Sequence, residues 1–220
     1  VENFEYEPDE VINTGLPRWD VLKDKSQGKR EILIMPTWRN WLDSVPDKDF
    51  EESDYFRHYM GLLNSERLNQ ILEKYDLEVN FYLHAKFQEY ADTFKSISKR
   101  IHLISFGEVA VNEMLMRCRM LITDYSSVCW DILYQDKPSL FYQFDIEKYN
   151  EAHGSYIDME TELFGDRAAT QEQLLDYLEE TVQNDFRLKP EYEKMRGEYL
   201  QFKDHEHSRH ICEEIKKRFH

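Results

Sequence analysis

The chain has 220 residues, of which 41% are hydrophobic and 14% aromatic, so it can bury a core and is not a disordered chain. Its 28 Lys and Arg stand against 44 Asp and Glu, a formal net charge of −16. This acidity argues against nucleic acid or an anionic membrane surface as a partner, because both require a basic face. No apolar run approaches the roughly 20 residues that cross a bilayer.

Short apolar runs alternate with helical patterns over the first two thirds of the chain. Strands buried on both faces are predicted at residues 30–35, 80–83, 101–104, 120–124 and 139–144. Helical spacing of apolar residues predicts helices at 65–74, 108–117 and 127–135. This alternation predicts an α/β fold with a Rossmann-like, doubly wound parallel sheet and helices on both faces.

The chain changes character after residue 144. Before that point, the polar stretch 40–54 is interpreted as a surface loop. After it, residues 170–184 have the pattern of an amphipathic helix that begins with a capping box of Thr170 and Gln173. Further helices are predicted after Pro190 and at 208–219. We therefore expect a Rossmann-like domain over residues 1–169 and a helical C-terminal extension over 170–220, packed on the same domain.

Cysteines and histidines do not form a metal-binding pattern. The three cysteines (Cys118, Cys129 and Cys212) lack metal spacing and are interpreted as buried apolar residues in a reducing compartment. The late histidines (His205, His207 and His210) have no metal-ligand spacing with Cys212 and form no H-E-x-x-H motif, so exposed or capping histidines are favoured over a metal site. The sequence therefore predicts no metal. It also has neither G-x-G-x-x-G nor a P-loop.

The segment 121–131, LITDYSSVCWD, is the most informative one. An apolar strand ends at Asp124, and a helix is predicted to begin near Ser126 or Ser127. Paired hydroxyls and unpaired N–H groups at a helix start form an anion site at the carboxyl edge of a parallel sheet. The alternative is that Ser126 is only a helix cap.

Four further motifs accompany it: GLPR at 15–18, PTWR at 36–39, YLH at 82–84 and FYQFDIEKY at 141–149. In this order and spacing, the set resembles the CDP-glycerol glycerophosphotransferase family, the teichoic acid polymerases of Gram-positive bacteria. The resemblance covers roughly residues 11–215. TDYSS followed so soon by FDIEKY is its most specific part.

The resemblance implies the C-terminal, donor-binding half of a GT-B arrangement, with 1–169 as the nucleotide-donor domain. It implies that Ser126 and Ser127 contact the donor diphosphate, and that His84 is catalytic, donating to a phosphate oxygen or acting as general acid toward the departing CMP. The other donor-binding positions that it implies are Arg18, Thr37, Arg39 and Asp131.

Each of these residues also has a structural interpretation. His84 is equally interpreted as a satisfied structural histidine, and Arg39 as the partner of the acidic loop behind it. Arg18 is interpreted as a turn residue, and Asp131 as a residue that caps its helix or pairs on it. Trp38 and Trp41 either stack on a base or belong to the core.

The implied reaction is phosphoryl transfer. A polymer hydroxyl attacks the β-phosphorus of CDP-glycerol, or of a ribitol relative, and CMP leaves; no other cofactor is required. The acceptor would be held through an N-terminal half with a W-H-G-T-like motif, which this chain lacks. Because the chain opens at Val1, we interpret it as cut from a longer protein.

The full protein would work at the cytoplasmic face of the cell membrane, attached through parts absent here. Two alternatives remain open: a GT-B glycosyltransferase that uses a nucleotide sugar, and a non-catalytic nucleotide-binding module. The late segment DHEHSRHI departs from the family pattern D-G-x-A-S-x-R-I, which leaves the role of a late arginine open.

Overall fold

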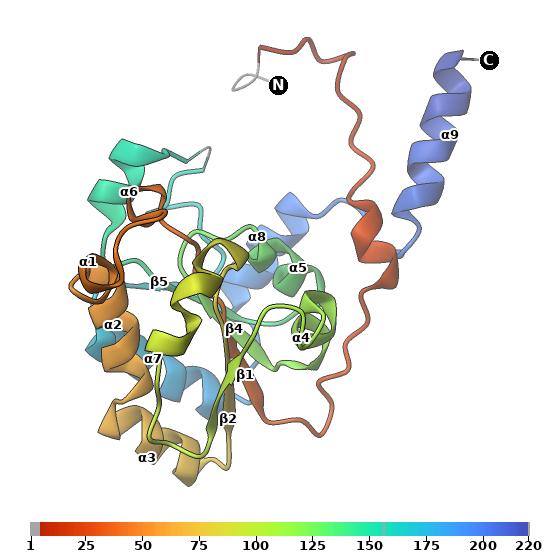
Figure 1. The fold of residues 1–220 in the computed structure, drawn as a ribbon. Coiled ribbons are helices and arrows are strands. Elements are labelled where there is room, and N and C mark those ends of the chain that lie inside the picture. Colours follow the sequence, from red (N-terminus) through yellow and green to blue (C-terminus); the bar gives the residue numbers. More distant parts are fainter. Residues whose placement is uncertain (1–4, 156, 220) are drawn as a thin grey trace.

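The computed structural model describes residues 5–155 and 157–219 and contains a six-stranded sheet whose paired strands all run parallel (Figure 1). The strands lie in the order β3-β2-β1-β4-β5-β6, that of the dinucleotide-binding Rossmann sheet. Their bounds are β1 Glu31–Ile34, β2 Glu78–Tyr82, β3 Ile101–Ile104, β4 Met120–Thr123, β5 Ser139–Tyr142 and β6 Asp166–Ala168. The chain reverses its direction of winding between β1 and β4, where such sheets bind ligands.

Helices cover both faces of this sheet, as predicted. The α-helices are α1 Asp47–Glu51, α2 Asp54–Leu63, α3 Glu66–Lys74, α4 Val111–Arg117, α5 Val128–Tyr134, α6 Ile146–Ala152, α7 Gln171–Gln183, α8 Pro190–Tyr199 and α9 His207–Phe219. The 3₁₀ segments are η2 Pro17–Val21, η3 Asn40–Leu42 and η4 Ala85–Thr93.

Alternation along the strands separates two cores. Ile32 and Ile34 of β1 pack with α2, α3, α7 and η4, whereas Leu33 and Met35 face the core built from η2, α4, α5 and α8. A strand buried on both faces is expected for a parallel sheet between two helical layers. The core positions therefore explain why the predicted strands are apolar nearly throughout.

The predicted surface loop at 40–54 is partly wrong. This segment contains η3 and α1, and Phe50 of α1 is fully buried. The Phe50 ring stacks on Tyr90 of η4 with a centroid distance of 3.9 Å. Burial of this aromatic ring draws an otherwise polar segment onto the core. The sequence prediction also missed α2, η4, α6 and β6, the last being a three-residue strand that begins with two charged residues.

The C-terminal helices begin as predicted. Thr170 and Gln173 form the reciprocal capping box of α7, and Pro190 is the first residue of α8. Helix α9 extends away from the sheet beside the N-terminal segment (Figure 1), where Arg218 donates to the Asp9 carbonyl at 2.7 Å. In the part of the chain that is described, no helix is long and apolar enough to cross a bilayer.

The expectation of an exposed or capping histidine is wrong for His207, which is completely buried. Its Nδ1 lies 3.1 Å from the Thr14 carbonyl oxygen, and its Nε2 lies 3.0 Å from the Tyr134 hydroxyl. His207 therefore ties the start of α9 to the N-terminal segment and to α5. Over residues 5–155 and 157–219, no group of three or more His, Cys, Asp or Glu side chains is placed to hold a metal ion.

Candidate functional site

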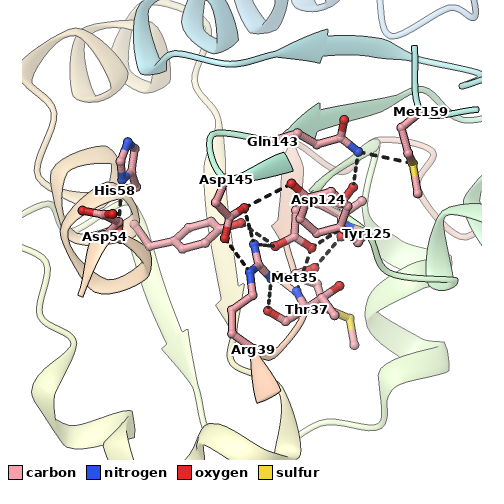
Figure 2. A network of polar contacts seen from close by, with 12 residues as sticks. Met35, Thr37, Arg39, Asp54, His58, Asp124, Tyr125, Gln143, Asp145 and Met159 are labelled. Carbon is pink, nitrogen blue, oxygen red and sulfur yellow. Dashed lines mark hydrogen bonds and ion pairs between the residues drawn. The ribbon is translucent and has the colours of Figure 1, made fainter. Parts of the chain in front are cut away.

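The carboxyl ends of β1 and β4 are joined by Asp124, the residue directly after β4. Its Oδ1 accepts the backbone N–H groups of Thr37 (2.8 Å) and Tyr125 (2.6 Å). Its Oδ2 accepts the Tyr59 hydroxyl at 3.1 Å and lies 2.9 Å from Nη2 of Arg39 (Figure 2). Because Asp124 is fully buried, these contacts fix the loops after β1 and β4 relative to each other.

Arg39 completes this network from the loop after β1. Its Nε and Nη2 donate to the two oxygens of Asp145, at 2.7 and 3.0 Å, and Nη1 donates to the Thr37 carbonyl at 2.7 Å. Burial alone would lower the pKa of Arg39, but the charges of Asp124 and Asp145 outweigh it and hold that pKa well above its usual value.

Arg39 is therefore not in the place that the motif resemblance implied. Its side chain has no exposed surface, and aromatic rings surround the guanidinium, among them Tyr125 at 4.9 Å and Tyr149 at 5.5 Å from its carbon. A phosphate cannot reach a side chain so placed. Arg39 instead links the PTWR, TDYSS and FDIEKY motifs through two carboxylates. Thr37 contributes its backbone to this network, and its buried hydroxyl has no partner among the described residues.

Arg18 and Asp131 form an ion pair with each other. Arg18 Nε and Nη2 donate to the Asp131 carboxylate at 2.7 and 3.2 Å, and the Trp19 indole donates to it at 2.8 Å. The Asp131 side chain is only 6% exposed, and its partners come from η2, so it pairs between two elements and not with a residue of its own helix. This pair joins the GLPR motif to α5. The Arg18 side chain is 52% exposed and keeps an open side.

Gly15 of the same motif explains the close approach of His207. Its φ is +72°, a backbone conformation that favours glycine, and a Cβ at this position would lie 2.0 Å from Nδ1 of His207. The first motif and the late histidine segment therefore form one packed unit.

Ser126 and Ser127 lie on the rim of a cavity of about 270 Å³ beside the loop after β4. Ser127 is the N-cap of α5 but makes no side-chain capping bond, and Ser126 Oγ is 3.5 Å from the Val128 nitrogen. The alternative in which Ser126 is only a cap is therefore weakly supported, because its bond is long. The lining is mainly apolar and comes from α5, β5 and the segment after α6: Cys129, Trp130, Phe141, Ile157, Met159 and Leu163.

His84 is the second residue after β2 and caps η4. Its Nδ1 accepts the Lys86 backbone N–H at 3.2 Å, which places the proton of the neutral imidazole on Nε2. Partial burial, and then the charge of Lys86, lower the pKa of His84, against a smaller opposing effect of Asp124. At neutral pH His84 is therefore a neutral hydrogen-bond donor.

The sequence interpretation missed Asp124 and Asp145 as site residues. Each follows a buried strand directly or within three residues, inside a motif that had already been singled out. The available signal was the pairing of strand-end carboxylates with an arginine after a neighbouring strand, since the carboxyl ends of parallel strands lie at one edge.

Comparison with known proteins places this chain in a family. Residues 1–217 match the family model described as CDP-glycerol:poly(glycerophosphate) glycerophosphotransferase. The chain is 30% identical over 215 residues to the minor teichoic acid biosynthesis protein GgaB of Bacillus subtilis, covering 92% of this chain and 23% of that protein. It is 26% identical to the teichoic acid glycerol-phosphate transferase of Staphylococcus aureus, covering 97% of this chain and 56% of that protein.

The fold is that of the wall teichoic acid polymerase TagF, with a TM-score of 0.70 at 21% identity over 99% of this chain and 55% of TagF. The chain thus spans between about a quarter and just over half of the proteins it resembles. The match to the family model over nearly its whole length decides the assignment: the chain belongs to the CDP-glycerol:poly(glycerophosphate) glycerophosphotransferase family.

Proposed function

We propose that this chain is the donor-binding part of an enzyme that transfers glycerol phosphate, or ribitol phosphate, from a CDP-activated donor to a teichoic acid or related polymer. The observation that carries the proposal is the apolar cavity of about 270 Å³ whose polar rim is formed by Ser126 and Ser127. Its lining by Trp130, Phe141 and Met159 suits the flat, partly apolar face of a nucleobase, and the serine hydroxyls suit its phosphates.

These residues would contribute to the reaction by positioning the donor's phosphates. The polymer hydroxyl forms a new bond to the β-phosphorus, the bond from that phosphorus to the bridging oxygen of CMP breaks, and the hydroxyl proton is lost to a base. The Ser126 and Ser127 hydroxyls would donate to diphosphate oxygens. The Nε2–H of His84 would donate to the transferred phosphoryl group without adding a fixed charge. The buried Arg39 network would hold the loops that carry these groups.

The domain assignment and the cellular setting belong to the same proposal. We take residues 1–169 as the donor domain and 170–220 as its helical extension; the packing of α7 against β5 and β6 supports an extension packed on the same domain. The main binding site for the acceptor polymer and attachment to the cytoplasmic face of the membrane would depend on further parts of a longer protein. The family name, in which CDP-glycerol is the donor, supports a cytidine nucleotide over a nucleotide sugar.

Isothermal titration of the chain with CDP-glycerol, CDP-ribitol, CMP and UDP tests the proposal. We expect cytidine nucleotides to bind more tightly than UDP. Replacing both serines (Ser126→Ala with Ser127→Ala) should weaken binding of the diphosphate donors by about a hundredfold or more, since two hydrogen bonds to charged oxygens, about 1.5 kcal/mol or more each, are lost.

The matched control is Ser105→Ala, an exposed serine that directly follows β3 at the same edge of the sheet. Unchanged donor affinity in a folded double-serine variant would contradict the assignment of the phosphate site. Equal or tighter binding of UDP would favour the nucleotide-sugar alternative.

A further inference from the structure

A second surface at the carboxyl edge of the sheet shares only His84 with the residues proposed to act on the donor. It consists of Trp38 and Trp41 from the loop after β1, His84 and Lys86 from the start of η4, and Lys148 and His153 from α6 and its end. We call this set the tryptophan surface. None of its members is among the residues that line the donor cavity.

Aromatic packing holds this surface together. The His153 ring packs against both indoles, with centroids 6.1 Å from Trp38 and 6.2 Å from Trp41. The His84 ring stacks over Trp38 at 6.2 Å with an interplanar angle of 26°. Three segments that are distant in sequence thus present one partly exposed aromatic face.

Two ammonium groups are held over that face. Lys86 Nζ lies 4.5 Å from the Trp38 ring centroid, and Lys148 Nζ lies 4.9 Å from that of Trp41. Such contacts hold the cation near the ring while its outer side stays hydrated. Lys86 also lies 3.2 Å from Asp43, in a pair whose side chains are 50% and 37% exposed. In a chain of net charge −16, a polyanion can dock only where cations are concentrated locally.

The direction of the proposed reaction connects this surface with the acceptor. Attacking and leaving oxygens are roughly in line across the phosphorus, so the acceptor approaches from the side opposite to CMP. Tyr125 lines the cavity assigned to the nucleotide. Tyr125 stacks on Tyr149 at 3.6 Å, and Tyr149 stacks on His153 at 4.9 Å, so stacked rings connect the tryptophan surface to the wall of the cavity.

We propose that the tryptophan surface binds the acceptor as a polyol-phosphate chain, with Lys86 and Lys148 pairing with successive phosphates and the indole faces of Trp38 and Trp41 covering the polyol carbons. This inference rests on the proposed function. Aromatic faces pack against aliphatic C–H groups, and ammonium groups pair with phosphate oxygens, so the surface matches both parts of the repeating unit. The partly buried, neutral His84 lies where this surface meets the reacting phosphoryl group.

The test uses a synthetic hexamer of glycerol phosphate as the probe, titrated into the chain by calorimetry and followed by the indole N–H signals in ¹⁵N spectra. The chain contains four tryptophans, so four indole signals can be assigned by Trp→Phe substitution. The hexamer is expected to shift the signals of Trp38 and Trp41, whereas CMP is expected to shift that of Trp130 in the cavity.

Replacing both lysines (Lys86→Gln with Lys148→Gln) should weaken hexamer binding by about tenfold and leave CMP binding unchanged. The matched control is Lys95→Gln with Lys99→Gln, which removes the same charge from exposed positions before β3. A hexamer that does not bind, or that is weakened equally by both double variants, overturns the inference. If CDP-glycerol still binds in that case, the proposed function stands alone; if CDP-glycerol itself fails to bind, the proposed function falls.

Discussion

Gly15→Ala is expected to destabilise the protein by more than the backbone strain of an alanine in the left-handed conformation. An alanine at φ +72° is strained by about 1–2 kcal/mol. The added Cβ would also lie 2.0 Å from Nδ1 and 2.6 Å from Cε1 of His207, which is completely buried. The imidazole would have to move, and its hydrogen bonds to the Thr14 carbonyl and the Tyr134 hydroxyl, about 1 kcal/mol each, would be lost. The expected loss in free energy of unfolding is about 3–4 kcal/mol.

Substitutions at two other glycines separate the effect of backbone strain from that of the clash with His207. Gly28 has the same φ of +72° but no atom within 4 Å of its added Cβ, so Gly28→Ala should lose only the conformational part, about 1–2 kcal/mol. Gly197 lies inside α8 with open space around it, so Gly197→Ala should stabilise by up to about 1 kcal/mol. Urea unfolding followed by far-UV circular dichroism measures all three variants on one scale.

A double-mutant cycle isolates the clash. In a His207→Ala background the imidazole is gone, so Gly15→Ala should then lose no more than Gly28→Ala does. The reasoning is refuted if Gly15→Ala and Gly28→Ala are equally destabilising in the otherwise unchanged chain. It is also refuted if the loss from Gly15→Ala persists in full after His207 is removed.

Three further predictions follow from the buried network and from His84. Arg39→Met should lower the free energy of unfolding by about 3–5 kcal/mol, because Asp124 and Asp145 stay buried without their cation; a loss below about 1 kcal/mol in urea unfolding would contradict this. Arg39→Lys should rescue only part of that stability, since one ammonium cannot reproduce the bidentate pair with Asp145 and the bond to the Thr37 carbonyl. The folded-state pKa of His84 lies below its usual 6.5, so the unfolded chain binds the proton more readily. The advantage of the wild type over His84→Asn in unfolding free energy should therefore shrink as the pH falls below about 6.5, and a constant difference between about pH 7.5 and 5 would show that His84 does not titrate this way.

Local pattern was sufficient to predict most of the scaffold. Apolar runs at 120–124 and 139–144 became β4 and β5, because the interior strands of a parallel sheet must be apolar on both faces. Thr170 and Gln173 formed their capping box, since its partners are only three residues apart. The family was evident for the same reason: apart from GLPR, each of its motifs is a short segment at the end of a strand.

The roles of the charged residues were decided only by tertiary structure. Arg39 meets Asp145 over a separation of 106 residues, and Arg18 meets Asp131 over 113. An arginine that follows a strand has the same sequence pattern whether it holds a phosphate or a buried carboxylate. His207 and Phe50 were misjudged for a related reason, because polar neighbours along the chain conceal a side chain that is buried by distant elements. Periodicity records which face of an element is apolar, whereas ion pairing and ligand access depend on which elements meet, and that is settled only when the chain has folded.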